Sequence, residues 1–360
     1  MAAPANRMFI SVAAYCDPLL GLTLQRALAQ AKWPEHLHFG VIDQSPAAAA
    51  LPNLPVARQL SPARLSCITI EPLQARGPCW ARALAMSLYE GEDWFFQIDS
   101  HMDFDLHWDE TLVCQAQQLL GQRTGPAAAG GGIVISSYPD AFVLEGGVPQ
   151  HGPTEAGKVL RHLVKPGQQF SGDHLVLTFE ACPVASATAL PGFHLGAGCL
   201  FAPGALVGRF PYDPYLYFHG EEQALAARLF SHGWDIFHMP GLPIYHLYRT
   251  PEVAADPALA RPLHWDASED AQRAMRWWQL EQRARHRVSA LLLSGTDPAW
   301  GVYGLGRVRS MADYAAFSGI DYAARRLAAR AYPPQDHASV THAGPGPSAP
   351  GAQPPKLDIS

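Results

Sequence analysis

The sequence predicts an α/β protein whose strands form a parallel, doubly wound sheet. Within the first hundred residues, short apolar runs alternate with stretches whose apolar residues recur at helical spacing. This alternation is typical of a parallel sheet with crossover helices. The chain has 360 residues, of which 48% are hydrophobic and 16% are charged. That composition is sufficient to bury a full core, so the main body of the chain is not intrinsically disordered.

Two helices and a loop connect the first four predicted strands. Asp17 followed by Pro18 is typical of a helix N-terminus, and this helix is expected to run through Gln30. Because ligands bind beyond the carboxyl ends of strands in such sheets, Ala13–Asp17 and Asp99–Asp103 are expected at a binding edge. The strands are expected at Met8–Ala14, Leu37–Ile42, Leu65–Ile70 and Asp93–Ile98, a loop at Ser45–Ala63 and a second helix at Gly77–Tyr89.

The remainder of the chain is less regular. Gly125–Gly132 is expected to be a flexible loop, and the Pro-, Gly- and Ala-rich stretch from Pro333 onward is expected to be disordered. The β-like runs are Ile133–Ser136, Leu175–Phe179, Gly198–Phe201 and Asp235–His238, and the predicted helices are Glu221–His232, Ser268–Leu293 and Asp313–Ala331.

Composition excludes several classes of protein. The net charge of -6 argues against a nucleic-acid-binding surface over the whole chain. The chain contains no run of 18 apolar residues, which a membrane-spanning helix would need. The N-terminus has no apolar stretch closed by a cleavage site. The six cysteines form no CxxC pair. They are expected to be free thiols in a reducing compartment, so we expect a cytoplasmic protein that binds neither nucleic acid nor membrane.

The segment Gln97–Asp103 (QIDSHMD) contains the strongest chemical signal. Asp99 ends a buried apolar strand and His101 follows two residues later, so both side chains of an extended segment point to the same side. One carboxylate and one imidazole suit a divalent cation such as Mn²⁺. The alternative is that Asp99 caps the next element and His101 is solvated.

Two later segments add candidate ligands. Glu221 and Glu222 open a predicted helix, where acidic residues are also favourable as simple caps. His246 lies in the segment YHLYR and could instead be a buried, hydrogen-bonded histidine. The remaining histidines, such as His151, His162, His337 and His342, have no metal-ligand spacing, and we expect them to be solvated.

These motifs carry a resemblance to a known family. The chain resembles the glycosyltransferases that include the cytoplasmic polypeptide N-acetylglucosaminyltransferases acting on hydroxyproline of the Skp1 protein, and it is similar to the mucin-type polypeptide N-acetylgalactosaminyltransferases. The resemblance spans roughly residues 8–325. The segments that carry it are ISVAAYCDP (10–18), ARGPCWAR (75–82), YEGEDWFFQIDSHMDFDLHWD (89–109), HGEE (219–222), YHLYR (245–249) and GLGRVRSMADYAAFSGID (304–321).

The resemblance implies a GT-A fold, in which a Rossmann-like nucleotide-sugar domain is merged with an acceptor-binding half and C-terminal helices. It implies a single domain over residues 8–332, divided into a nucleotide-sugar half (8–110) and an acceptor half (111–332), with a tail at 333–360. It also implies that Asp99, His101 and His246 hold Mn²⁺ or another divalent cation. The residues expected to bind the UDP-sugar are Ala13, Tyr15, Asp17, Arg82, Gln97, Ser100, Tyr248 and Arg249.

Several of these roles have alternatives. Asp17 could be only a helix N-cap, and Arg82 could be a surface helix residue that pairs with a nearby acid. Glu221 and Glu222 are assigned to catalysis through positioning of the sugar or acceptor, because retaining enzymes of this fold often lack a well-placed nucleophile. A covalent role for Glu221, Glu222 or Asp213 is the alternative.

We therefore expect a metal-dependent, retaining glycosyltransferase that moves N-acetylglucosamine or a related sugar from UDP to a hydroxyl group, on a protein, a peptide or a glycan. A homodimer is compatible with the resemblance. The alternatives are a metal hydrolase built on Asp99, His101 and His246, and a non-catalytic nucleotide-sugar-binding protein.

Overall fold

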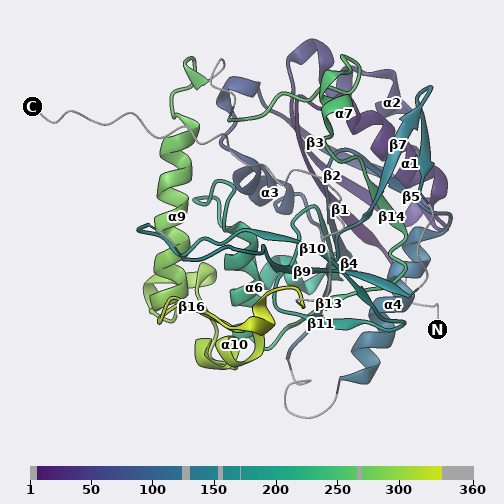
Figure 1. Ribbon diagram of the computed structural model, residues 1–360. Coiled ribbons are helices and arrows are strands. Elements are labelled where there is room, and N and C mark those ends of the chain that lie inside the picture. The colour runs from purple at the N-terminus through teal and green to yellow at the C-terminus, as the bar shows by residue number, and fades with distance from the viewer. Residues whose placement is uncertain (1–5, 124–129, 153–156, 171, 266–269, 335–360) are drawn as a thin grey trace, which may run out of the picture.

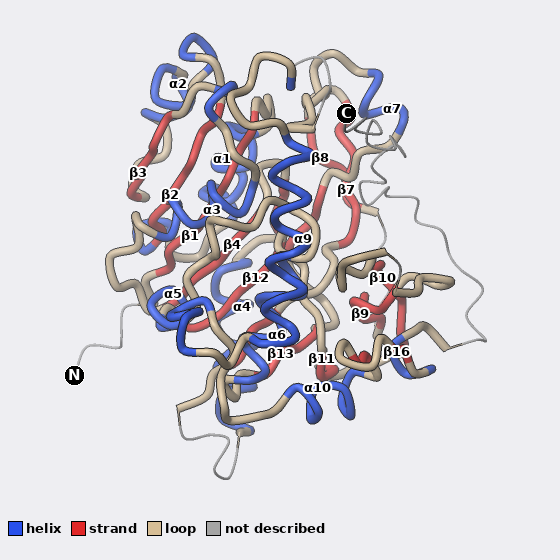
Figure 2. Tube along the Cα trace, turned by 90° about the vertical axis from the view of Figure 1, so that its left-hand side faces the viewer, coloured by secondary structure: helices blue, strands red, loops and turns tan. Residues whose placement is uncertain are grey.

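The computed structural model describes residues 6–123, 130–152, 157–170, 172–265 and 270–334. Its largest element is an eight-stranded sheet with the order β11-β13-β6-β12-β4-β1-β2-β3. Helices cover both faces of this sheet (Figure 1 and Figure 2). Its strands are β1 (Met8–Tyr15), β2 (Leu37–Gln44), β3 (Arg64–Thr69), β4 (Trp94–Ile98), β6 (Ile133–Ile135), β11 (Leu190–Gly192), β12 (Cys199–Pro203) and β13 (Asp235–His238).

One half of the sheet is parallel. β1 pairs in parallel with β2 and β4, and β2 pairs in parallel with β3. Side chains of β1 alternate between the two faces, as the two-residue period of a strand requires. Ile10 packs in one hydrophobic cluster and Phe9 in another, and both are fully buried. The parallel arrangement predicted for the first four strands is therefore confirmed.

The other half of the sheet is mixed, so the prediction of a wholly parallel sheet is wrong there. β12 is antiparallel to both β4 and β6, and β11 is antiparallel to β13. The segment before β12 lies beside the carboxyl end of β4, because the Asp99 N–H donates to the Gly198 carbonyl at 3.3 Å. The chain therefore enters β12 at the edge where β4 ends and must run in the opposite direction.

Helices form the outer two layers. On one face, α1 (Leu20–Gln30) and α4 (Trp108–Gln122) share a hydrophobic cluster with β1 and β4. On the other face, α3 (Pro78–Met86), α5 (Ala205–Arg209), α6 (Glu221–Ser231) and α9 (Trp277–Ser294) pack in a second cluster. Figure 1 shows these two groups on opposite sides of the central strands. The helix predicted at Glu221–His232 and the strand at Asp235–His238 are confirmed.

A four-stranded sheet brings distant parts of the chain together. Its order is β5-β14-β7-β8, and the last residue of β14, His246, lies opposite Met102 of β5. This register places His246 next to the segment that carries Asp99 and His101. The remaining elements are β5 (Met102–Phe104), β7 (Asp140–Glu145), β8 (Val148–His151), β9 (Lys158–Val164), β10 (Phe179–Ala185), β14 (Ile244–His246), α2 (Pro55–Arg58), α7 (Pro251–Ala255), α10 (Met311–Ser318), β15 (Ile320–Asp321) and β16 (Arg326–Leu327).

Four predicted helices differ from the structure at their ends, and one of them, α3, ends at Met86 rather than at Tyr89. α1 begins at Leu20 rather than at Asp17. Of the helix predicted at Ser268–Leu293, residues 268 and 269 lie outside the described residues, residues 271–276 are not helical, and α9 begins at Trp277, whose N–H donates to the Asp270 carboxylate at 2.8 Å. The last helix stops at Gly319, which adopts a left-handed conformation with φ of 80° and closes α10. A short hairpin of β15 and β16 follows.

The strand predicted at Leu175–Phe179 is absent until its last residue, where β10 begins. The Leu175 N–H donates to Ser289 Oγ at 2.8 Å, and the Leu177 N–H donates to Gln223 Oε1 at 2.7 Å. Side chains of α9 and α6 thus satisfy backbone groups that a neighbouring strand would otherwise bind. Residues 175–178 therefore pack against α6 and α9 and do not join a sheet.

The expected solvation of His162 is wrong, whereas His151 is exposed as expected. His162 is 1% exposed and stacks on Tyr138 with 4.2 Å between ring centroids. His151 Nε2 contacts the buried carboxylate of Asp103 at 2.6 Å. His337 and His342 lie outside the described residues, as do most of Gly125–Gly132 and nearly all of the tail from Pro333.

Two expectations from composition can be compared with the fold. In the described part of the chain, no helix is long and apolar enough to cross a membrane. All six cysteines are described, and each carries a free thiol.

Candidate active site

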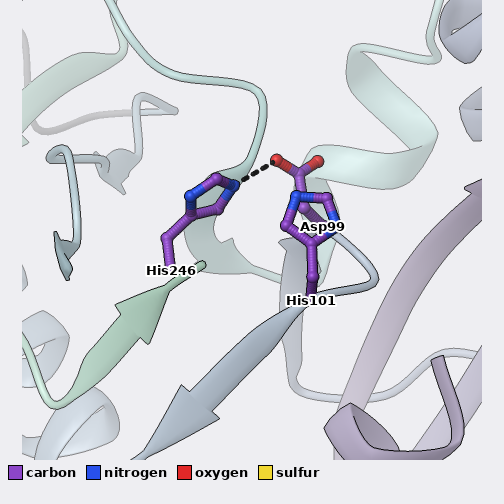
Figure 3. Close-up of side chains that lie close together, drawn as sticks. All are labelled: Asp99, His101 and His246. Atoms are coloured by element: carbon purple, nitrogen blue, oxygen red, sulfur yellow. Dashed lines mark ion pairs between the residues drawn. The ribbon is translucent and has the colours of Figure 1, made fainter. Parts of the chain in front are cut away.

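Asp99, His101 and His246 form the Asp-His-His cluster shown in Figure 3. Each residue offers a ligand atom that lies within 4.8 Å of the other two. Asp99 is the first residue after β4, and His246 arrives through the pairing of β14 with β5. The closest contact joins Asp99 Oδ2 and His246 Nε2 at 3.4 Å. The structure therefore brings together three side chains that lie up to 147 residues apart, from Asp99 to His246.

The protonation states of this cluster suit metal ligands. Burial opposes ionisation of Asp99, but the hydrogen bond with His246 and the charges of His101 and Arg82 hold the pKa of Asp99 well below its usual range. Burial also lowers the pKa of His246 to about 4, despite its contact with Asp99. At neutral pH the cluster thus presents a carboxylate anion and a neutral imidazole, which are the forms that bind a divalent cation.

Asp17 orients His101. Its Oδ2 atom lies 2.8 Å from His101 Nδ1 and accepts the Ser100 hydroxyl at 2.6 Å. Its Oδ1 atom accepts the Leu19 N–H at 2.9 Å, so Asp17 also caps the turn that leads into α1, which itself begins at Leu20. Burial opposes ionisation of Asp17, but His101 keeps the pKa of Asp17 lowered. With Nδ1 held by a carboxylate, His101 presents Nε2 to a ligand.

Arg82 and Glu221 form a buried ion pair behind Asp99. Arg82 Nη1 donates to Glu221 Oε1 at 2.6 Å, and Nη2 donates to Asp99 Oδ1 at 3.2 Å. The Cys79 thiol donates to the second oxygen of Glu221 at 3.0 Å. Arg82 is 6% exposed, so the interpretation of it as a surface helix residue is wrong. Burial raises the pKa of Glu221, and the charge of Arg82 opposes that shift.

Glu222 lies next to Glu221 in the first turn of α6, but its carboxylate contacts a different part of the chain. Its Oε1 atom accepts the Ala197 N–H at 2.7 Å, which fixes the segment that precedes β12. In that segment Gly198 packs so closely that an added Cβ would lie 2.4 Å from Asp99 Oδ2. The two glutamates thus hold different neighbours of Asp99: Glu221 binds Arg82, and Glu222 binds the backbone next to Gly198. Asp213, the third carboxylate considered, pairs with Arg287 at 2.6 Å.

The other predicted donor-binding residues are placed as follows. Ala13 and Tyr15 lie in β1, and the Tyr15 hydroxyl accepts a hydrogen bond from Arg273. Gln97 is fully buried and donates to the Ala197 carbonyl at 2.7 Å. The ring of Tyr248 lies 4.3 Å from that of His246, and its hydroxyl donates to the Pro139 carbonyl at 2.8 Å. Arg249 donates to the Arg261 carbonyl at 3.0 Å.

Sequence reasoning missed three residues that line this region. Arg261 carries a charge that acts on both Asp17 and Asp99. His264 bonds the Tyr217 hydroxyl at 2.7 Å and the Ala75 carbonyl at 2.9 Å, and the guanidinium of Arg273 lies 5.4 Å from the centre of the Tyr15 ring. Arg261 and His264 come from a stretch without periodicity or a known motif, and Arg273 falls within the helix predicted at Ser268–Leu293, so no signal in the sequence distinguishes them.

Comparison with known proteins identifies the class. The family model described as Glycosyltransferase (GlcNAc) matches residues 46–324 of the chain. The chain therefore belongs to this glycosyltransferase family, as the motifs predict. A comparison with curated proteins finds no significant match.

Solved structures show the same architecture. A crystal structure of GalNAc-T7 with UDP, GalNAc and Mn²⁺ superposes with a TM-score of 0.52 at 15% sequence identity, covering 87% of this chain and 54% of that one. This chain thus spans about half the length of GalNAc-T7 in that structure. A crystal structure of S. aureus TarS 1-349 matches with a TM-score of 0.42 at 12% identity, covering 81% of this chain and 74% of that one. The likeness to GalNAc-T7 confirms the predicted GT-A fold class.

Proposed function

We propose that the protein is a metal-dependent, retaining glycosyltransferase that moves N-acetylglucosamine or a related sugar from a UDP-sugar to a hydroxyl acceptor. The single observation that carries this proposal is the Asp-His-His cluster at the carboxyl end of β4, in a chain of the Glycosyltransferase (GlcNAc) family. GalNAc-T7, which shares the fold, was crystallised with UDP, GalNAc and Mn²⁺.

The residues of the cluster fit a divalent cation. Two imidazoles and one carboxylate form a donor set suited to Mn²⁺ and its neighbours among the transition metals. The Nδ1 atom of His246 is buried without a partner among the described residues, while its Nε2 atom faces Asp99. A cation held there would stabilise the negative charge that develops on the leaving diphosphate.

The protein's own residues then perform the remaining tasks. Asp17 holds the His101 ring in one orientation through its contact at Nδ1. Arg82 fixes the Asp99 carboxylate, and Glu221 neutralises the buried charge of Arg82. Glu222 anchors the Ala197 backbone beside the cluster and has a side chain that is 36% exposed, so it can also reach a sugar or acceptor hydroxyl.

For the acceptor, we propose a hydroxyl group on a protein or peptide, because the motifs resemble those of polypeptide-modifying transferases. The free thiols are consistent with action in the cytoplasm.

Release of UDP from a panel of UDP-sugars tests the proposal without knowledge of the acceptor. The reaction is run with Mn²⁺ and again with EDTA. We expect slow hydrolysis of one UDP-sugar that depends on the metal, and this result would identify the donor. Hydrolysis that continues in EDTA would contradict metal dependence, and the absence of both hydrolysis and UDP binding would contradict the proposed function.

A further inference from the structure

Arg261 is tied to the Asp-His-His cluster through the segment that follows His246. The Leu247 N–H donates to the His101 carbonyl at 3.0 Å, and the Leu247 carbonyl accepts from Arg261 Nη2 at 3.1 Å. Arg249 Nη1 donates to the Arg261 carbonyl at 3.0 Å, which holds the backbone of Arg261 in place. The guanidinium of Arg261 is therefore held by the backbone of Leu247, the residue that directly follows the cluster residue His246.

The second terminal nitrogen of Arg261 has no partner among the described residues. Nη1 is buried and makes no hydrogen bond with any described residue. A buried N–H group without an acceptor is costly, and such groups in native proteins point to a missing ligand, water or ion. Nη1 is thus a donor prepared for an acceptor that the described part of the chain does not supply.

The nearby carboxylates attract Arg261 without bonding to it. Burial lowers the pKa of Arg261, while the charges of Asp17 and Asp99 oppose that shift. The Asp17 oxygens already accept from Leu19, Ser100 and His101. The Asp99 oxygens face Arg82 and His246. Because those oxygens are engaged, the acceptor for Nη1 must arrive with its own oxygens.

We infer that Arg261 binds the diphosphate of the donor nucleotide through its free Nη1 group. This inference rests on the proposed function and assigns a new residue to the donor site. A guanidinium forms strong, directed hydrogen bonds to phosphate oxygens, and its charge persists at any physiological pH. Its position beside the cluster lets one diphosphate contact both Arg261 and a cation held by Asp99, His101 and His246.

A purely structural role for Arg261 makes a different prediction. In that case the bond from Nη2 to the Leu247 carbonyl would be the important contact, and its loss would disturb the whole site. Binding of uridine, UMP and UDP would then weaken to a similar extent. A direct role affects only the ligands that carry phosphate, and affects UDP most.

Calorimetry with uridine, UMP and UDP, each in the presence of Mn²⁺, distinguishes these roles. For Arg261→Ala we expect UDP to bind about 10- to 100-fold more weakly, which is the loss of one or two charge-assisted hydrogen bonds. Uridine should bind within about a factor of two of its wild-type affinity. Arg261→Lys keeps the charge but not the fork of donors, so it should lie between Arg261→Ala and the wild type.

Arg326→Ala is the matched control, because the Arg326 side chain is 78% exposed in the hairpin of β15 and β16. It should leave all three affinities unchanged. Equal weakening of uridine and UDP in both Arg261 variants, or no weakening of UDP, would overturn the inference while leaving the proposed function intact. If the wild-type protein binds none of the three ligands, the proposed function fails instead. Melting temperatures of each variant show whether the fold is retained.

Discussion

Two polar clusters lie on either side of the segment that precedes β12, and they differ in how their polar groups are partnered. In the first, Asp99, Arg82 and Glu221 alternate in charge, and each has an opposite charge within 3.2 Å. The second comprises His162, His194 and His238. Both ring nitrogens of His162 lack a hydrogen-bond partner among the described residues.

The histidine cluster of His162, His194 and His238 is held by packing. His194 stacks on Phe179 with ring centroids 3.5 Å apart, and the His162 ring lies 5.0 Å from that of His238. His194 Nε2 lies 3.5 Å from Glu222, which is long for a hydrogen bond. Burial holds the pKa of His162 well below its usual range and lowers the pKa of His238 to about 3.

The difference between the two clusters shows which polar side chains of this protein can carry charge at neutral pH. The paired charges of Arg82 and Asp99 remain ionised and can act on a ligand, whereas burial lowers the pKa of His162 and His238, so these imidazoles remain neutral and serve as packing groups. The two clusters should therefore respond to different perturbations.

The largest expected effect is on turnover. Asp99→Ala should reduce metal-dependent hydrolysis of the UDP-sugar about 1000-fold or more, because charge stabilisation worth several kcal/mol is lost. Asp173→Ala, whose side chain is 73% exposed, is the control and should retain full activity. Full activity of Asp99→Ala would show that the Asp-His-His cluster has no catalytic role.

The next effect is on stability. Glu221→Ala removes the principal partner of a buried arginine, so the free energy of unfolding should fall by about 3–5 kcal/mol in urea denaturation. Glu90→Ala breaks the exposed pair with Arg64, in which both side chains are about half exposed, and should cost about 1 kcal/mol or less. Similar losses in the two variants would contradict the distinction between buried and exposed pairs.

His162 and His238 should make the protein sensitive to acid. Burial lowers the pKa of His238 to about 3 in the folded state, from a usual value of 6.5, so the unfolded chain binds more protons between these pH values. The contribution of such a histidine to the free energy of unfolding is therefore fully present above pH 6.5 and falls as the pH is lowered. At pH 5 the loss is about 2 kcal/mol for each histidine that stays neutral in the folded state.

His162→Phe keeps the stacking on Tyr138 and removes a titrating group, so it should flatten the decline in stability measured by denaturation at pH 7 and pH 5. His286→Gln is the control, because the His286 side chain is 51% exposed. It should leave the fall in the free energy of unfolding between pH 7 and pH 5 unchanged. An unchanged slope in His162→Phe would show that this residue does not contribute to the acid response.

The smallest expected effects come from two glycines on the segment between the clusters. A Cβ at Gly196 would lie 2.6 Å from His162 Cε1, and one at Gly198 would lie 2.4 Å from Asp99 Oδ2. Gly196→Ala should lower the free energy of unfolding by about 1–3 kcal/mol, as overpacking does. Gly198→Ala should mainly weaken Mn²⁺ binding, measured by calorimetry. Equal effects of the two variants on both measurements would show that the clusters are not independent.

Much of this arrangement could be predicted along the chain. The four parallel strands follow from alternating apolar runs, and Asp99 follows from its place at the end of β4. The end of α10 and the course of residues 175–178 could not be predicted, because they depend on one left-handed glycine and on side chains from α6 and α9.

Sequence alone determined the family, the parallel half of the sheet and the three residues of the Asp-His-His cluster as candidates, because these depend on local patterns and motifs. Only the tertiary structure decided the partners: Arg82 turns inward to Glu221, Asp17 turns to His101, and Arg261 bonds the Leu247 carbonyl next to His246 and keeps one nitrogen without a partner among the described residues. The physical reason is that a buried charge takes its partner from whatever element packs against it, and that choice depends on contacts between segments far apart in the sequence.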